Sequence, residues 1–223
     1  MDLVRVSHRL RRALGGDDWW RADGPWEVMV GALLTQQTAW RNVARALRSL
    51  REEGLLTPEA LAVASLARIE ACLQPTGFYR TKARRLRCMA AHLLSASGST
   101  GAFLARPPEE LRRDLLGLEG VGEETADAIL LYAAGHPTPV VDAYTRRILE
   151  RLGAPLPLGY AAAAATLRAA LPNRVADHRR FHALMVELGK RHCRPAPRCG
   201  PCPLLDLCPH GRRVVANAVS AGL

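Results

Sequence analysis

The sequence predicts an all-α protein. Leu, Ala and Val recur at helical spacing along almost the whole chain, whereas no stretch alternates apolar and polar residues for long enough to indicate a β-strand. Turn signals divide the chain into about ten helices with short connections. These turns are expected at 23–25, 53–54, 74–77, 95–101, 106–108, 117–122, 135–139 and 153–159.

The composition indicates a folded protein with a polyanionic partner. Of the 223 residues, 48% are hydrophobic and 23% are charged, so the chain can bury a core and is not a disordered basic tail. Its 31 Lys and Arg outnumber 21 Asp and Glu, and the net charge is +10. This excess favours nucleic acid first and an anionic membrane surface second, because basic side chains that neutralise phosphates release counterions.

The sequence also constrains the cellular location of the protein and the number of lysine amines available for a reaction. No apolar run reaches the roughly 18 residues that a membrane span needs, and the first residues do not form a signal peptide, so we expect a cytoplasmic protein. Only Lys82 and Lys190 are lysines. A reaction that needs a lysine amine therefore has two candidates.

All four tryptophans lie between 19 and 40, in and before a strongly apolar segment. We expect core packing for Trp26. For Trp19 and Trp40, core packing and stacking against a ligand both remain open.

A Gly-rich turn at 117–122 separates two amphipathic helices, one that begins at 107–108 and one that includes 129–133. Glycines let a ligand approach the backbone, and the N-terminus of the second helix presents N–H groups with positive dipole character. In a chain this basic, we interpret the turn as a binding site for a DNA phosphate rather than as a purely structural connection. Three acidic residues near the turn are expected to weaken that affinity: Glu119, Glu123 and Glu124.

Asp142 follows two β-branched residues, Val140 and Val141, and precedes a helical segment. Without further context this pattern predicts a helix N-cap, in which the carboxylate accepts a backbone hydrogen bond from the next turn.

Four of the six cysteines form the spacing C-x5-C-x2-C-x5-C near the end of the chain: Cys193, Cys199, Cys202 and Cys208. The prolines between them stiffen a loop that could wrap a metal centre. A disulfide is disfavoured in a cytoplasmic chain, and the spacing alone fits zinc and a 4Fe-4S cluster equally well. Cys72 and Cys88 lie in apolar helical segments, where we expect both to be buried.

In this order, the hairpin at 118–126, the Val141-Asp142 pair and the four-cysteine tail resemble the helix-hairpin-helix DNA glycosylases of the endonuclease III superfamily. The resemblance extends from Trp19 to Cys208. It implies a two-lobed, all-α fold with a six-helix domain at 25–135, which carries the hairpin, and an iron-sulfur cluster domain formed by 1–24 and 136–223. It also implies that double-stranded DNA lies across the cleft between the lobes, with one nucleotide flipped into it.

The resemblance assigns chemistry to individual residues. Asp142 matches the essential aspartate of the superfamily, and the four cysteines match the ligands of a 4Fe-4S cluster, which is favoured over zinc. The first cysteine interval is one residue shorter than the x6 of endonuclease III. Endonuclease III also has a hairpin lysine that forms a Schiff base with the sugar, whereas Glu124 stands at the matching position here, and a carboxylate cannot form an imine.

The segment 26–40, W-E-V-M-V-G-A-L-L-T-Q-Q-T-A-W, resembles more closely the 3-methyladenine glycosylase branch of these enzymes. That branch lacks the lysine, and its aromatic residues at positions matching Trp19 and Trp40 sandwich the base; we place Glu124 in the same pocket. A 3-alkylated adenine is cationic, stacks well on electron-rich rings and leaves as a neutral base, so no general acid is needed.

The remaining DNA contacts are also assigned by resemblance. Gln37 is expected to fill the hole left by the extruded base, and Phe78 to wedge into the opposite strand. The hairpin residues expected to bind the DNA backbone are Gly120, Val121, Gly122 and Thr125. The cysteine loop is expected to present four basic residues to DNA: Lys190, Arg191, Arg194 and Arg198.

Together these features predict a monomeric, nucleoid-associated DNA glycosylase of base excision repair, monofunctional on alkylated purines. Asp142 would stabilise an oxocarbenium-like transition state and position water. Two alternatives remain open. One is a bifunctional glycosylase and abasic-site lyase acting on oxidised pyrimidines, and the other is a non-catalytic protein that binds damaged DNA.

Overall fold

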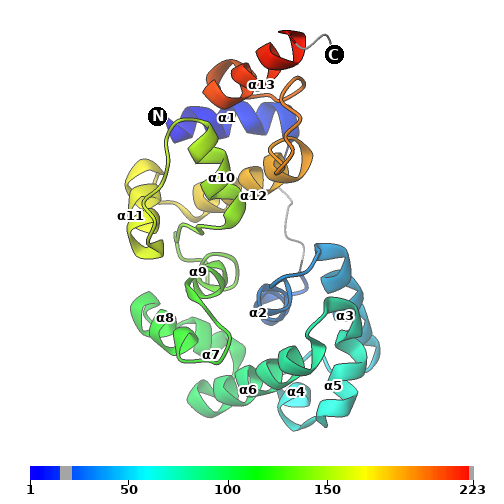
Figure 1. Cartoon of the computed structure of the whole chain (residues 1–223). Helices are drawn as coiled ribbons and strands as arrows, with labels where there is room; N and C mark the ends of the chain where they lie inside the picture. The colour runs from blue at the N-terminus through cyan, green and yellow to red at the C-terminus, as the bar shows by residue number, and fades with distance from the viewer. Residues whose placement is uncertain (16–21, 221–223) are drawn as a thin grey trace. The chain divides into compact units, whose positions relative to one another are not determined.

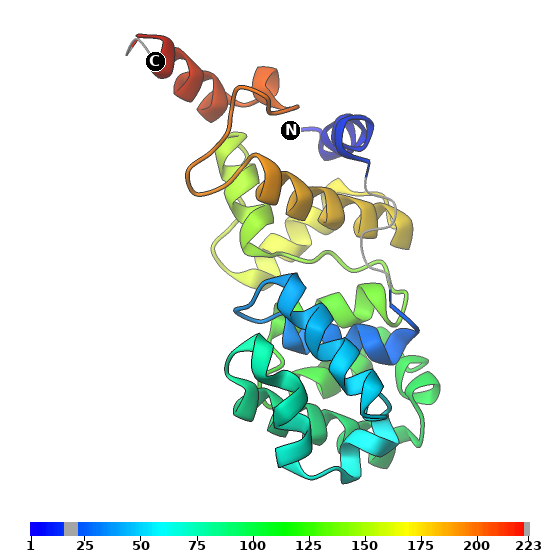
Figure 2. The ribbon, with the colours of Figure 1, turned by 90° about the vertical axis from the view of Figure 1, so that its right-hand side faces the viewer.

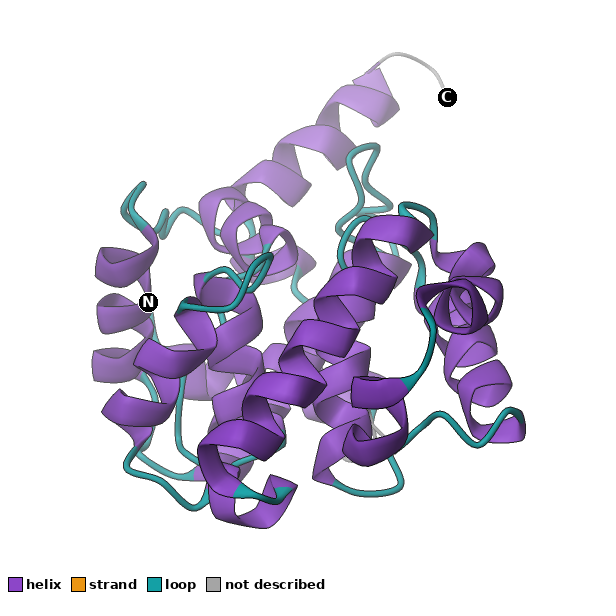
Figure 3. Cartoon of the chain, turned by 90° about the horizontal axis from the view of Figure 1, so that it is seen from below, coloured by secondary structure: helices purple, strands orange, loops and turns teal. Residues whose placement is uncertain are grey.

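The computed structural model describes residues 1–15 and 22–220, and their regular structure is entirely helical (Figures 1 and 3). Within these residues the chain forms thirteen α-helices, two short 3₁₀-helices and no β-strand, which confirms the all-α prediction. The number of helices exceeds the predicted ten because no turn was predicted at 35–39, at 64–65 or at 171–174, where the structure ends one helix and begins the next. Two of the helices are short, α4 (Pro58–Val63) and α7 (Thr100–Leu104). None of the described helices is both long enough and apolar enough to cross a membrane.

The chain divides into two compact units. The central unit is Ala22–His136, and the terminal unit combines the described residues of Met1–Arg21 with Pro137–Leu223. Besides α4 and α7, the central unit contains α2 (Pro25–Leu34), α3 (Trp40–Glu52), α5 (Leu66–Leu73), the 3₁₀-helix η1 (Gln74–Thr76), α6 (Tyr79–Ser97), α8 (Pro108–Leu116) and α9 (Glu123–Tyr132). The terminal unit contains α1 (Leu3–Leu14), α10 (Ala143–Arg151), α11 (Tyr160–Ala170), α12 (Val175–Arg191), the 3₁₀-helix η2 (Leu205–Leu207) and α13 (Pro209–Ser220).

The core of the central unit is organised around α2. Every residue of this helix from Trp26 to Leu34 is buried, and α3, α6 and α9 pack around it. Such all-round burial explains why the segment is apolar without a polar stripe. The burial of Trp26 confirms its predicted role in core packing. Helices α4 and α5 pack against α6, and α5 also packs against α3.

The terminal unit is built on α12. Helix α1 packs against α12, and its buried face carries Leu3, Val6 and Leu10 at helical spacing. Helix α10 packs against α12 as well (Figure 2). Their close approach requires Gly189, because a Cβ atom there would lie 2.2 Å from the ring of Tyr144.

The two cysteines outside the tail have different environments. Cys72 is buried in α5, as predicted, but Cys88 is exposed on α6, and the prediction for Cys88 was therefore wrong. The buried face of α6 carries Leu86, Met89 and Leu93, and Cys88 lies off that stripe.

Candidate functional site

Helices α8 and α9 form the predicted hairpin, and an ion pair between a part-exposed arginine and a buried carboxylate holds them together. Arg112 Nε on α8 donates to Asp127 Oδ1 on α9 at 2.7 Å, and Asp127 is buried. In the turn between the helices, Gly120 has φ of 82°, and a Cβ atom there would lie 2.2 Å from Arg85 Nε. The backbone conformation favours glycine at this position, and the guanidinium end of the Arg85 side chain occupies the space that a Cβ atom would take.

The turn offers fewer free N–H groups than predicted. The Val121 N–H donates to Leu118 O at 3.0 Å, so it serves the turn itself. Helix α9 begins after Gly122, which provides no side-chain cap, and the N–H of Ala126 is the first to bond back, to Gly122 O at 2.9 Å. The first-turn N–H groups of α9 therefore supply the positive end of the helix dipole at this turn.

The acidic residues near the turn are largely neutralised within the central unit. Glu119 lies 2.7 Å from Arg84 and 3.6 Å from Arg85, and the hydrogen bond from Arg84 holds the pKa of Glu119 below its usual value. Glu123 lies 3.5 Å from Arg112. The expected penalty for a phosphate at the turn is therefore reduced by local ion pairs.

Gln36 connects the α2–α3 loop to the hairpin, which sequence reasoning missed. Its Nε2 donates to Gly120 O at 2.8 Å and to Thr125 Oγ1 at 3.0 Å. The buried Thr125, expected to bind DNA, thus accepts a hydrogen bond from Gln36 in this structure. The only hint in the sequence was its position beside Gln37.

Gln37 and Phe78 share an unusual backbone conformation. Gln37 is exposed with φ of 54°, and Phe78 is 69% exposed with φ of 47°. In the described part of the chain, no other non-glycine residue has a positive φ. This conformation costs about 1 kcal/mol or more for a residue with a Cβ atom, and such residues concentrate at ligand-binding sites.

The residues predicted for the base pocket are only partly described. Trp40, the first residue of α3, is 38% exposed, so it is not a core residue and retains surface for stacking. Glu124 is exposed in the first turn of α9. Trp19 lies outside the described residues.

Asp142 belongs to the terminal unit and is the N-cap of α10, as the local pattern predicted. Its Oδ1 accepts from the Thr145 N–H at 2.7 Å, and its Oδ2 lies 3.6 Å from Nε2 of the buried His182 on α12. Burial by itself would raise the pKa of Asp142, but the His182 imidazole and the Thr145 N–H outweigh it and hold this pKa below its usual value. The Asp142 side chain is therefore a buried carboxylate that stays ionised at neutral pH, and the residue is 7% exposed. His182 gave no signal in the sequence, because it follows Asp142 by forty residues.

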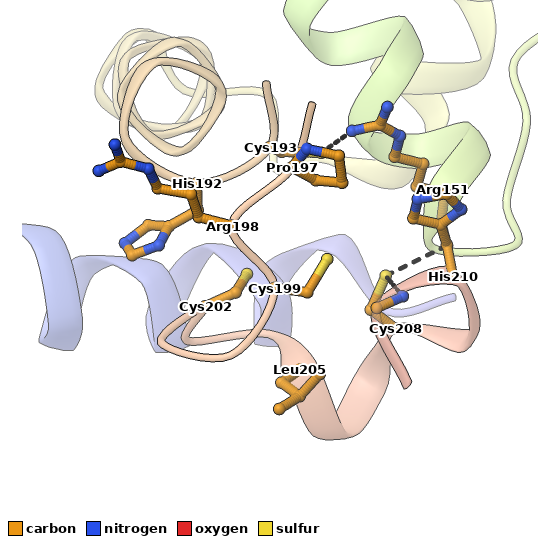
Figure 4. A pocket seen from close by; sticks show the side chains of 11 residues that line it. Arg151, His192, Cys193, Pro197, Arg198, Cys199, Cys202, Leu205, Cys208 and His210 are labelled. Atoms are coloured by element: carbon orange, nitrogen blue, oxygen red, sulfur yellow. Dashed lines mark hydrogen bonds between the residues drawn. The ribbon is translucent and has the colours of Figure 1, made fainter. Parts of the chain in front are cut away.

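The four tail cysteines line one cavity of about 290 Å³ that includes space open to solvent (Figure 4). Arginines from two helices hold the cysteine loop. Arg151 on α10 donates to Cys193 Sγ at 3.4 Å and to Arg194 O at 2.6 Å, and Arg9 on α1 donates to Pro203 O at 2.7 Å. Among the described residues, no three His, Cys, Asp or Glu side chains are placed so that they could hold one metal ion.

The chemistry of the cavity fits a cationic group. Burial, with added repulsion from the other cysteines, raises the pKa of Cys199 and Cys202, so four thiolates are unfavourable without a compensating cation. Two imidazole nitrogens at this cavity, His192 Nδ1 and His210 Nε2, are buried with no hydrogen-bond partner within the described chain. Polar atoms of this kind are expected to face a bound group.

The basic residues of the cysteine loop have mixed environments. Arg191 pairs with Glu187, and Arg194 Nε donates to Lys190 O at 2.6 Å. Arg198 is exposed and lines the cavity, and Lys190 is exposed in the last turn of α12.

Comparisons with known proteins agree with this architecture. Residues 30–171 match the family model described as HhH-GPD superfamily base excision DNA repair protein. A Methanocaldococcus jannaschii protein whose name describes it as a DNA repair glycosylase is 37% identical over 92% of this chain and 95% of its own length.

Two solved structures resemble the fold. A non-covalent endonuclease III–DNA complex has a TM-score of 0.81 and 25% identity, and the match covers 96% of this chain and 97% of that one. The H. pylori 3-methyladenine DNA glycosylase bound to 1,N6-ethenoadenine has a TM-score of 0.73 and 27% identity, and the match covers 86% of this chain and 98% of that one.

Proposed function

The chain belongs to the HhH-GPD superfamily of base excision DNA repair proteins, and we propose that within it the chain is a monofunctional DNA glycosylase that removes alkylated purines from double-stranded DNA. The alkylpurine substrate is supported by the resemblance of segment 26–40, by the part-exposed Trp40, and by the similarity to a 3-methyladenine DNA glycosylase structure. The proposed place of action is the cytoplasm, at the nucleoid.

The monofunctional assignment rests on the positions of the two lysines in the chain. Glu124 stands where a Schiff-base lysine would be needed. The Lys82 amine is buried and donates to Leu34 O and Thr76 O, so it cannot reach a sugar without leaving the core. Lys190 lies at the end of α12, three residues before Cys193 and away from the hairpin sequence.

In this proposal, the α8–α9 turn binds a DNA phosphate through the N–H groups of Gly120, Gly122 and the first turn of α9. Gln37 fills the hole in the duplex, Phe78 wedges the opposite strand, and Trp40 stacks on the extruded base. Together with the hydrogen bond from Gln36, Thr125 supports the turn.

Asp142 supplies the electrostatic part of the reaction. The departing purine leaves positive charge on the sugar, and an ionised carboxylate held in a buried setting stabilises that charge more strongly than one in water. Oδ1 accepts from the Thr145 N–H, whereas Oδ2 lies 3.6 Å from His182 Nε2 and would use its remaining lone pair to face the sugar or a water molecule. The same side chain thus serves as N-cap and as the proposed catalytic group.

The four cysteines would hold a 4Fe-4S cluster, which fits the raised thiol pKa values and the unpartnered imidazole nitrogens at the cavity. When bound, the cluster would act as a structural centre that fixes the cysteine loop between the arginines of α1 and α10. Iron, sulfide and zinc analysis of the purified protein tests this assignment. Stoichiometric zinc without iron would contradict it.

The function is tested by single-turnover assays on two duplexes, one with an alkylated purine and one with thymine glycol, each read with and without alkali. We expect strand breaks only in the alkylated duplex and only after alkali. Breaks at thymine glycol without alkali, trapped by borohydride as a covalent adduct, would identify a bifunctional lyase. Tight binding of both duplexes with no base release would instead identify a binding protein.

A further inference from the structure

We propose that Gln36 and Lys82 are positioning residues that hold three segments of the central unit in one fixed arrangement for DNA binding. The segments are the α8–α9 turn, the α2–α3 loop that carries Gln37, and the turn after η1 that carries Phe78. This inference rests on the proposed function, in which all three segments contact DNA.

Lys82 lies on α6 and is only 3% exposed. Its Nζ donates to Leu34 O at 3.0 Å and to Thr76 O at 2.9 Å. Leu34 is the last residue of α2, and Thr76 is the last residue of η1, so one ammonium group binds the C-terminal carbonyls of two helices. A cation is favourable at such ends because the carbonyls are unsatisfied and carry the negative end of the helix dipole.

The contacts of Lys82 lead directly to Phe78. The backbone N–H of Lys82 donates to Phe78 O at 3.0 Å, while its side chain binds the carbonyl two residues earlier. On the other side, Leu34 precedes Gln37 by three residues. The single buried amine therefore fixes the chain just before both of the exposed side chains that have positive φ.

A packing role alone does not account for a lysine at this position. An apolar side chain of similar length would fill the same space without the cost of burying a charge. Among the described residues, no carboxylate lies within ion-pair distance of the Lys82 amine, and burial lowers its pKa. What the amine adds over an apolar residue is a link between two carbonyls at the ends of separate helices, each next to a loop.

Gln36 supplies the second link. Its amide binds Gly120 O and Thr125 Oγ1 of the hairpin, and it is the immediate neighbour of Gln37. The loop that carries Gln37 is thus attached to the hairpin on one side and, through Leu34 and Lys82, to the turn that carries Phe78 on the other. Strained positive-φ residues persist only where their surroundings hold them, and these two links provide that restraint.

The test uses the full-length protein and two variants that keep side-chain length, Lys82→Met and Gln36→Met. The probe is a duplex with 2-aminopurine opposite a tetrahydrofuran abasic site, whose fluorescence rises when the opposite base is unstacked. We expect each variant to bind this duplex about tenfold more weakly and to lose most of the fluorescence rise. Affinity for an undamaged duplex should change less than about threefold.

A matched control separates positioning from loss of stability. Leu61→Ala opens a cavity on α4 of the same unit, and all measurements are made well below the unfolding midpoint of the least stable variant. If Leu61→Ala reduces the fluorescence rise as much as Lys82→Met at equal loss of thermal stability, the positioning role is wrong.

A double-mutant cycle gives the sharpest readout. If Lys82 acts through the two loops, Lys82→Met should weaken abasic-site binding less than about twofold in a Gln37→Ala, Phe78→Ala background. A full, additive effect in that background would overturn the inference. Wild-type protein that shows no preference for the abasic duplex would instead overturn the proposed function, a result that the wild-type control alone reveals.

Discussion

The hairpin of the central unit and the cysteine cavity of the terminal unit differ in how their polar groups are satisfied. Around the hairpin, several buried groups have hydrogen-bond partners within the chain: Asp127 has Arg112, Gly120 O has Gln36, and the Lys82 amine has two carbonyls. Arg85 Nε, beside Gly120, has no hydrogen-bond partner in the described chain but lies 3.6 Å from the carboxylate of Glu119. At the cavity, His192 Nδ1 and His210 Nε2 have no partner in the described chain, and burial among other thiols raises the pKa of Cys199 and Cys202.

This difference indicates two ways in which the polar groups of a site can be satisfied, by other side chains of the protein or by a bound group. The hairpin is preorganised by side chains of the protein itself, so DNA would meet donors that are already placed. In the proposed function, a bound group completes the cavity, and folding of the tail is then coupled to binding of that group. Asp142 lies in the terminal unit but resembles the hairpin in this respect, because Thr145 and His182 already surround it.

The largest effect is expected at the cysteine cavity. Cys202→Ser should abolish stable incorporation of iron and lower the unfolding midpoint by about 10 °C or more, because ligand binding contributes to folding there. Iron analysis and thermal unfolding measure both effects. The exposed Cys88→Ser is the matched control and should change neither. Normal stability in an iron-free Cys202→Ser protein would show that the cavity, like the hairpin, is completed by the chain alone.

Asp142→Asn should reduce single-turnover base release by about 100- to 1000-fold, the usual loss when one electrostatic group is removed from a transition state. Stability should change by less than about 1 kcal/mol, because Asn is as good an N-cap as Asp. Base-release kinetics and urea unfolding of the same preparation separate the two roles. If base release stays within about threefold of wild type, Asp142 is a structural cap and not a catalytic group.

Arg112→Met tests whether the hairpin depends on its internal ion pair. Leaving the buried Asp127 unpaired should cost about 2–3 kcal/mol of unfolding free energy. Arg84→Met removes an exposed pair with Glu119 and should cost much less than Arg112→Met, because water screens an exposed pair. Equal losses in urea unfolding would mean that burial does not distinguish these two pairs.

The smallest effect is expected for the dependence of folding stability on pH. Burial lowers the pKa of His178 from 6.5, and both ring nitrogens are unpartnered in the described chain. Because the unfolded chain then binds the proton more readily, stability should fall as pH drops below 6.5, by at most about 1.4 kcal/mol per pH unit, until the folded pKa is reached. His178→Gln should remove this loss between about pH 7 and pH 5. An unchanged pH dependence in the variant would assign the slope to other groups.

Most of the fold was predictable because local patterns determine helices. The Gly-rich turn at 117–122, Pro108 at the start of α8 and the N-cap pattern at Asp142 each indicate a helix boundary through backbone chemistry that acts over a few residues. The helix breaks at 35–39 and 64–65 were not predicted, since neither segment contains the Gly or Pro that signals a turn. The exposure of Cys88 was not predicted because the apolar residues near it define one buried face of α6, and Cys88 lies on another face.

The sequence by itself determined the helical class, the hairpin, the N-cap at Asp142 and the clustering of four cysteines, since each depends on residues close together in the chain. Only the tertiary structure decided which distant side chains complete these features. It placed His182 beside Asp142, Gln36 against the hairpin, and Lys82 between the carbonyls of Leu34 and Thr76. Except for the Lys82–Thr76 contact, which spans six residues, those contacts join residues forty or more positions apart. Their energy depends on burial and on short distances between polar atoms, which no local pattern encodes.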